Sequence, residues 1–215
     1  MIKLFGYFRS SAAYRVRIAL NFKQIEWESA IIHLTKDGGE QFSEAYKRVN
    51  PQSLLPTLED EEIYYTQSIA ILEYLEEKYP NPPLLPNRPK LRAHARALAL
   101  AIACDIHPIN NLRVLHYLTQ KMKFDDTQKL AWYQHWIAVG FTSIEAMLAR
   151  SPDTGEFCCG DKVSLADICL VPQVFNAKRF SCDLSGYPII KRINETCLQL
   201  KQFETAAPDK QKDAE

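Results

Sequence analysis

Two adjacent serines, Ser10 and Ser11, are the residues near the start of the sequence best suited to chemistry. They follow a short apolar run with aromatics, residues 2–8, which predicts a strand. Apolar residues at helical spacing come next and predict a helix over residues 10–22. Serine is favoured as an N-cap because its hydroxyl accepts a bond from a free backbone N–H of the first turn. Two hydroxyls at the positive end of a helix can also form a small anion site, so both interpretations stay open.

Three arginines stand close to these serines. Arg9 precedes them, and Arg15 and Arg17 follow within two turns of the predicted helix. Their positive charge would add to an anion site at the serines. The alternative is that Arg15 and Arg17 lie on a solvated face of the helix, and we expect this of at least one of them.

The elements that must position these residues form a small α/β domain. After the first strand and helix, residues 25–33 predict a second strand, and residues 41–49 predict a short helix. Two short runs, residues 56–58 and 63–65, flank an acidic turn and predict a hairpin, and a last helix ends at residue 79. This βαβαββα order, with one parallel pair joined by a crossover helix, predicts a thioredoxin-like domain over residues 1–80.

The rest of the chain has a different pattern. Residues 81–87 are rich in proline and form the predicted linker. Residues 88–215 show helix patterns and no convincing strand, so we predict an all-helical domain, a helical bundle, that ends in a frayed polar tail from residue 206. The predicted helices of this part include residues 91–104, 127–148 and 188–203.

Composition excludes several classes of protein. The 26 basic residues equal the 26 acidic ones, which argues against a nucleic-acid-binding protein. The longest apolar run, residues 97–104, is too short to span a bilayer, and the start of the chain shows no secretory leader. Six cysteines show neither a Cys-x-x-Cys pair nor zinc-ligand spacing, so we predict no metal site and reduced, mostly buried thiols in a cytoplasmic protein.

Several motifs resemble the cytosolic glutathione transferases, which join a thioredoxin-like domain to an all-helical one. Residues 54–58 (LLPTL) resemble the family's loop with a cis proline, here the Leu55–Pro56 bond. The pair Gln67-Ser68 resembles its γ-glutamyl-binding pair. Residues 164–167 (SLAD) have the spacing of a capping-box variant and resemble the family's folding cap, which we interpret as structural.

The opening stretch narrows the resemblance to the zeta class, the maleylacetoacetate isomerases. The signature of that class, Ser-Ser-Cys-x-x-Arg-Val-Arg-Ile-Ala-Leu, is matched over residues 10–20 except that Ala12 replaces the cysteine. Residues 170–174 and 176–180 also look like this class. Residues 104–111 resemble its bacterial members, including maleylpyruvate isomerases.

The resemblance implies a glutathione-dependent isomerase of maleylacetoacetate, with maleylpyruvate as the close alternative substrate. A thiol that adds to a conjugated cis double bond removes it, the resulting single bond rotates, and expulsion of the thiol leaves the trans isomer. A free thiol of pKa about 8.5 is little ionised at neutral pH, so the site must favour the thiolate. A general conjugating transferase and a non-catalytic binding module remain alternatives, although several arginines around the sulfur favour the isomerase.

The resemblance also implies a role for each candidate residue, and a homodimer as the assembly. From the residues alone, we favour the ordinary start of an edge strand for Leu55-Pro56, and we interpret Ser68 first as a helix cap. His107 lacks a partner at metal-ligand spacing and is otherwise a histidine at a helix kink, and Arg179 is a surface cation. The implied catalytic residues are Ser10, Ser11 and Arg15; the implied glutathione contacts are Ser10, Ser11, Ala12, Gln41, Leu55, Gln67, Ser68, His107, Asn111 and Arg113; the implied dicarboxylate contacts are Arg9 and Arg179.

Overall fold

The computed structural model describes all residues from Met1 to Glu215. The chain forms two compact units, one of Met1–Leu84 with Leu198–Glu215 and the other of Leu85–Cys197. The sequence placed everything after the linker in the helical domain. The structure differs because the last helix and the tail group with the first unit.

The first unit is built on a mixed sheet in the order β2-β1-β3-β4. The central strand β1 pairs in parallel with β2 and antiparallel with β3, which continues into β4 through a hairpin. Glu61 and Glu62 both have positive φ, as a tight two-residue hairpin turn requires. The predicted parallel pair and hairpin are therefore confirmed. The strands are β1 (Ile2–Gly6), β2 (Trp27–Ile31), β3 (Thr57–Asp60) and β4 (Ile63–Thr66).

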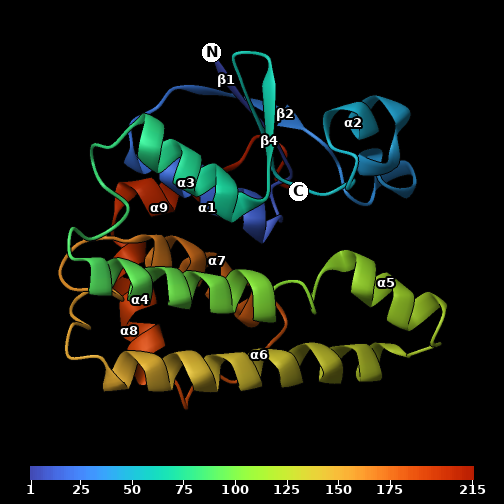
Figure 1. Ribbon diagram of the computed structural model, residues 1–215. Coiled ribbons are helices and arrows are strands. Elements are labelled where there is room, and N and C mark those ends of the chain that lie inside the picture. The colour runs from blue at the N-terminus through green and yellow to red at the C-terminus, as the bar shows by residue number, and fades with distance from the viewer. The chain divides into compact units, whose positions relative to one another are not determined.

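Helix α1 (Ser11–Phe22) is the best-buried helix of this unit. It packs against α3 (Ser68–Lys78) and also against α9 (Lys201–Ala206), which comes from the end of the chain. Figure 1 shows α1 and α3 running side by side along the sheet. With neighbours on several sides, every residue of α1 from its first to Leu20 is buried. The alternative of a solvated face for Arg15 and Arg17 is therefore wrong.

The connection from β2 to β3 contains three short helical segments. The sequence predicted one helix over residues 41–49, but the structure interrupts it at Ser43. That residue has extended backbone, and its hydroxyl accepts a bond from the Tyr46 N–H at 3.2 Å, so it caps the second piece. The segments are η1 (Lys36–Gly38), η2 (Glu40–Phe42) and α2 (Glu44–Val49).

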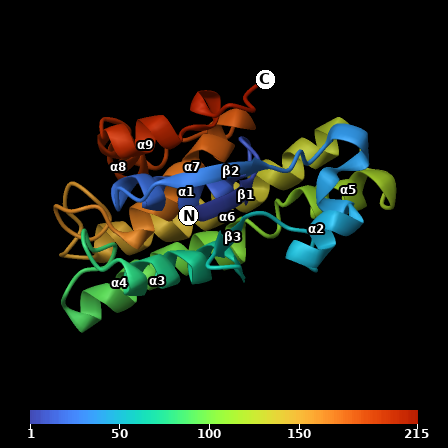
Figure 2. The ribbon, with the colours of Figure 1, turned by 90° about the horizontal axis from the view of Figure 1, so that it is seen from above.

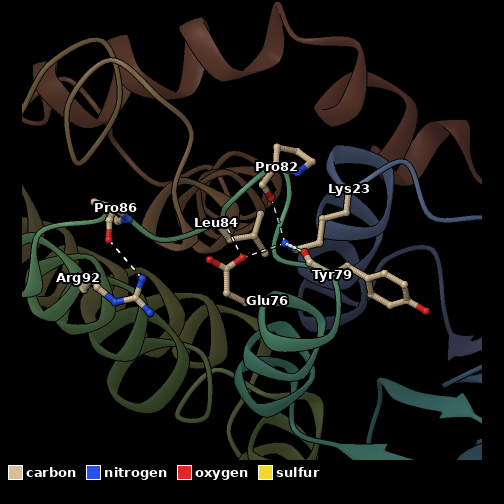
Figure 3. Close-up of polar contacts among 7 residues, drawn as sticks. All are labelled: Lys23, Glu76, Tyr79, Pro82, Leu84, Pro86 and Arg92. Carbon is tan, nitrogen blue, oxygen red and sulfur yellow. Dashed lines mark hydrogen bonds and ion pairs between the residues drawn. The ribbon is translucent and has the colours of Figure 1, made fainter.

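The C-terminal end of α1 is closed by a buried lysine, Lys23, whose side chain is 0% exposed. Its ammonium donates to Glu76 Oε2 at 2.8 Å and to the carbonyls of Tyr79 and Pro82 at 2.5 and 3.0 Å (Figure 3). Glu76 Oε2 also accepts from the Leu84 N–H at 2.8 Å. One buried ion pair thus ties α1, α3 and the chain that leaves α3.

The second unit is all-helical. Helix α7 lies at its centre, with twelve of its fifteen residues buried, and packs against α4. The longest helix, α6, carries a capping box at Asp125, and α5 lies beside its N-terminal end (Figure 2). No helix of the chain combines the length and apolar character needed to cross a membrane. The elements are α4 (Pro89–Leu100), the π-helical η3 (Ala101–Ile106), α5 (Leu112–Gln120), α6 (Asp126–Arg150), α7 (Leu165–Arg179) and α8 (Pro188–Leu198).

The predicted cap of α7 is confirmed. The buried carboxylate of Asp167 accepts from the backbone N–H of Ser164 and from that of Cys158, each at 2.8 Å. Burial raises the pKa of Asp167, although these bonds oppose the rise. Four of the six free cysteines are buried, as the composition predicted.

The end of the chain corrects two predictions. A single helix over residues 188–203 is wrong, because α8 ends at Leu198 and α9 begins at Lys201. The frayed tail from residue 206 is also wrong, because the segment forms η4 (Pro208–Lys210) and then accepts a hydrogen bond from the Phe8 N–H, within the first unit. We call residues 207–215 the tail segment.

Candidate active site

Ser10 is the N-cap of α1, as its position predicted. Its backbone is extended, and its hydroxyl oxygen accepts a bond from the Ala13 N–H at 3.2 Å. Because capping uses only a lone pair, the hydroxyl hydrogen can still be donated to an anion. The cap and the anion site are therefore compatible functions of the same side chain.

The start of α1 also has a favourable electrostatic setting for an anion. Its first turn contains no acidic residue, so nothing opposes the positive end of the helix dipole. Ser11, the first helical residue, is buried beside the half-buried Ser10. Arg9 is exposed, with its guanidinium 4.6 Å from the centre of the Phe8 ring. A weak acid such as a thiol is expected to ionise more readily here.

Arg15 was expected to act in the chemistry, but the structure gives it a different setting. It is only 1% exposed, and its Nη1 donates to the Ser68 hydroxyl at 3.1 Å. A guanidinium buried in this way supports Ser68 and is poorly placed to bind a substrate dicarboxylate directly. We therefore revise its expected function from catalysis to positioning.

The Gln67-Ser68 pair starts α3 in an unusual conformation. Gln67 occupies the N-cap position with φ of 68°, and its Nε2 donates to Gln52 Oε1 at 2.9 Å. Ser68 is the first helical residue, so its interpretation as the cap is wrong. Positive φ in a non-glycine residue costs about 1–3 kcal/mol and is concentrated at ligand sites. The backbone N–H groups of this helix end, together with Ser68, suit a carboxylate.

The loop before β3 presents backbone groups to a peptide. The Leu55–Pro56 bond is cis, as the resemblance implied. Neither the N–H nor the C=O of Leu55 makes a hydrogen bond within the chain. An extended peptide can therefore pair with both groups as an added strand.

Two residues that sequence reasoning missed hold this loop. The carbonyl of Leu54 accepts from the Tyr46 hydroxyl at 2.8 Å and from Asn50 Nδ2 at 2.9 Å. Both donors are buried. Tyr46 belongs to α2 and Asn50 is the C-cap of that helix, so both donors come from one short stretch of the chain. The available signal was an asparagine directly before Pro51, where a helix is expected to end.

Gln41 is another predicted glutathione contact whose setting is informative. It is 4% exposed, and its Nε2 donates to the Leu34 carbonyl at 3.3 Å, whereas its buried Oε1 has no partner. The amide lies against Gly39, where a Cβ would come within 2.6 Å of it, and φ of 104° also favours glycine there. An unpaired buried acceptor costs about 1–3 kcal/mol, so it is suited to a ligand donor.

The remaining predicted residues belong to the second unit. Asn111 caps α5, because its Oδ1 accepts from the Arg113 N–H at 3.1 Å. His107 follows the π-helical η3, and Arg179 ends α7 with its guanidinium 5.1 Å from the centre of the Phe180 ring. Arg113 and Arg179 are exposed. Their contacts with glutathione or a dicarboxylate stay predictions.

The second unit also contains an open groove of about 770 Å³ between α6 and the segment after α7. Ile137, Thr142, Cys182 and Tyr187 are among its lining residues, and none of the predicted site residues lines it. No group of three or more histidine, cysteine or acidic side chains is arranged to hold a metal ion. The polar features suited to a peptide ligand are therefore those of the first unit.

Comparison with known proteins places this chain in a family. Residues 4–83 match the model of the glutathione S-transferase N-terminal domain. The chain is 52% identical over 211 residues to a probable maleylacetoacetate isomerase of Vibrio cholerae, covering 98% of this chain and 97% of that protein. It superimposes with a TM-score of 0.96, at 44% identity, on the holo structure of a maleylpyruvate isomerase described as a bacterial zeta-class transferase, with 99% and 100% of the two chains covered.

A third relative has ligands in its active site. It is a maleylacetoacetate isomerase from Anaeromyxobacter dehalogenans, with dicarboxyethyl glutathione and citrate bound. The TM-score is 0.87 at 38% identity, over 100% of this chain and 98% of that one. The chain belongs to the glutathione transferase family, in its zeta class together with the maleylacetoacetate and maleylpyruvate isomerases.

Proposed function

We propose that this chain is a glutathione-dependent cis–trans isomerase that converts maleylacetoacetate to fumarylacetoacetate. The observation that carries the proposal is the 52% identity, over nearly the whole of both chains, to a protein named probable maleylacetoacetate isomerase. The 44% identity to a maleylpyruvate isomerase makes maleylpyruvate the alternative substrate.

The residues of the first unit fit glutathione. The unpaired backbone groups of Leu55 and the unpaired Oε1 of Gln41 are free to bond to a peptide, and the start of α3 with Ser68 suits its α-carboxylate. When bound, glutathione supplies the thiolate that adds to the double bond and leaves after rotation. Ser10 donates its hydroxyl hydrogen to the sulfur, while the oxygen stays fixed by the Ala13 N–H. Ser11 and the N-terminal backbone of α1, including that of Ala12, add to the stabilisation of negative charge.

The substrate requires cationic side chains. We assign Arg9 and Arg179 to its carboxylates, because both are exposed and a guanidinium matches a carboxylate in shape and charge. Support comes from the Anaeromyxobacter relative, which holds the tricarboxylate citrate and a dicarboxyethyl adduct. His107, Asn111 and Arg113 are assigned to glutathione on the resemblance alone. A site for apolar electrophiles would not need these arginines, so a general transferase is the weaker alternative.

We also propose a homodimer that works in the cytoplasm. The dimer rests on the resemblance, and the location on six free thiols, which fit a reducing compartment. Size-exclusion chromatography with light scattering tests the assembly.

The function is tested by following the ultraviolet absorbance of maleylacetoacetate, with and without glutathione, and of maleylpyruvate in parallel. We expect turnover only with glutathione and a higher kcat/KM for maleylacetoacetate. Slow turnover of both, combined with rapid conjugation of a simple electrophile, would favour a general transferase.

A further inference from the structure

The turn between β1 and α1 is held by side chains at both of the backbone polar groups of Phe8. This buried residue precedes Arg9 and Ser10. Its N–H donates to Asp213 Oδ2 at 2.9 Å, and its C=O accepts from Arg17 Nη2 at 3.1 Å. One of the two groups that hold the turn therefore lies 205 residues away along the chain.

The second group belongs to the same network. Arg17 is 3% exposed, and its Nε also donates to the Ala206 carbonyl at 3.0 Å, at the end of α9. Burial lowers the pKa of Arg17 to about 10, while the charges of Tyr14 and Asp213 oppose the shift, so the guanidinium stays charged at neutral pH. Arg17 thus joins the turn to α9, and Asp213 joins it to the tail segment.

Two further side chains, Gln211 and Glu215, fix the tail segment itself. Gln211 Nε2 donates to the carbonyls of Thr205 and Ala207, which folds the segment back on α9. Glu215 Oε1 lies 3.0 Å from His33 Nε2. The other ring nitrogen of His33 accepts from the Lys36 N–H at 2.9 Å, so Nε2 carries the hydrogen and donates it to Glu215.

We propose that Asp213 is a positioning residue for the reaction, because its carboxylate fixes the Phe8 N–H and with it the backbone that carries Arg9 and Ser10. A carboxylate that accepts from a backbone N–H makes a short, charge-assisted bond. Small displacements of a catalytic group are costly in rate. Loss of the Asp213 contact is therefore expected to slow the reaction by displacing Arg9 and Ser10, although Asp213 lies at a distance from the sulfur. The proposal rests on the proposed function only in assigning Ser10 to the sulfur of glutathione.

The test compares Asp213→Ala and Asp213→Asn with the control Asp209→Ala. Asp209 is an exposed carboxylate of the same segment whose only ion pair is with the adjacent Lys210, at 3.8 Å. Three quantities are measured: hydrogen exchange at the Phe8 amide, the pH midpoint of the thiolate absorbance of bound glutathione, and isomerase kcat/KM.

We expect Asp213→Ala to speed exchange at Phe8 by about tenfold or more, because a bond to a charged acceptor is lost. It should raise the thiolate midpoint and lower kcat/KM by about tenfold. Asp213→Asn retains an acceptor oxygen, so its thiolate midpoint and its kcat/KM should return most of the way to the parent values. Asp209→Ala should match the parent in all three measurements.

An unchanged thiolate midpoint and kcat/KM in Asp213→Ala would overturn the proposal, as would an Asp213→Asn variant that is as impaired as Asp213→Ala. Failure of the proposed function is distinguishable, because it would show in the parent as absent glutathione-dependent turnover. Hydrogen exchange at the Phe8 amide reports its bond to Asp213 whether or not the substrate is correctly assigned.

Discussion

The two ends of helix α1 use polar side chains in opposite ways. At the C-terminal end, the ammonium of Lys23 has three N–H donors and meets three oxygens, so its bonding capacity is exhausted. At the N-terminal end, the Ser10 oxygen accepts one bond and its hydroxyl hydrogen remains to be donated. The completed network is structural, whereas the incomplete one has capacity for a ligand.

The arginines of α1 and of the residue just before its cap show the same contrast. Arg9 is exposed, whereas Arg15 and Arg17 are buried and donate to groups of the chain itself. Three identical side chains within nine residues therefore differ in what they can contact. Burial and bonding separate the arginine suited to a substrate from the two that position other residues.

Lys23→Met should produce the largest effect, and on stability alone. Removing the buried ammonium breaks the ion pair with Glu76 and takes the donor away from the carbonyls of Tyr79 and Pro82, so we expect the free energy of unfolding to fall by about 3–5 kcal/mol. Isomerase activity per folded molecule should stay within about twofold of the parent, because a structural contact of this kind does not bear on the barrier. Urea unfolding and active-site-normalised kinetics measure the two quantities.

The matched control is Lys129→Met, which removes the exposed pair with Asp126 and should cost at most about 1 kcal/mol. A Lys23→Met protein no less stable than this control would show that the α1 C-terminal network is dispensable.

Ser10→Ala should give the converse result, a large loss of activity with a small loss of stability. Losing a donor to a catalytic anion costs about 2.7–4 kcal/mol of barrier, which is a factor of about 100 to 1,000 in kcat. Losing the cap costs about 1 kcal/mol of stability. Steady-state kinetics, circular dichroism and thermal unfolding separate these effects.

Ser43→Ala is the control for the cap, because Ser43 caps α2 through the same kind of bond at the same 3.2 Å. It should lose similar stability and less than about threefold in activity, since no ligand contact is removed. If Ser10→Ala kept near-normal turnover, Ser10 would be a cap alone and Ser11 would take its assigned function.

Arg179→Ala should have an intermediate and selective effect. A charged hydrogen bond is worth about 1.5–3 kcal/mol, so KM for the dicarboxylate should rise by about tenfold or more while KM for glutathione changes by less than about twofold. Arg150→Ala, at the end of α6 and also exposed, is the control and should change neither. Equal increases in both KM values would remove Arg179 from the substrate site.

The sequence predicted what is local and missed what is distant. Helix α1, its cap at Ser10, the hairpin and the cap of α7 follow from periodicity and from pairs a few residues apart. The Lys23–Glu76 pair spans 53 residues and the Asp213–Phe8 bond spans 205, and neither has a sequence pattern. The burial of Arg15 and Arg17 was missed because it depends on packing by α3 and α9, and α9 comes from the end of the chain.

Ala12→Cys should have the smallest effect, and it tests whether α1 needs a thiol of its own. The zeta-class signature has cysteine at this position, and Ala12 is 6% exposed in the first turn of α1. In the proposed mechanism, Ser10, Ser11 and the backbone N–H groups stabilise a bound thiolate without it. A protein thiol beside glutathione also introduces the risk of a mixed disulfide. We therefore expect a competent parent and a gain of less than tenfold, about 1.4 kcal/mol, in the variant.

Ala12→Ser is the control for Ala12→Cys, because serine adds one side-chain atom at the same position but has no thiol. Isomerase turnover of the parent and of both variants is measured with and without glutathione. Reactions that need an enzyme thiol to resolve a glutathionyl adduct should be weak in the parent and should be gained only in Ala12→Cys. An inactive parent that is rescued by cysteine and not by serine would mean that the negative charge on sulfur is stabilised by a side chain that α1 lacks. In that event the incomplete bonding at the N-terminal end of α1 would not be sufficient for catalysis.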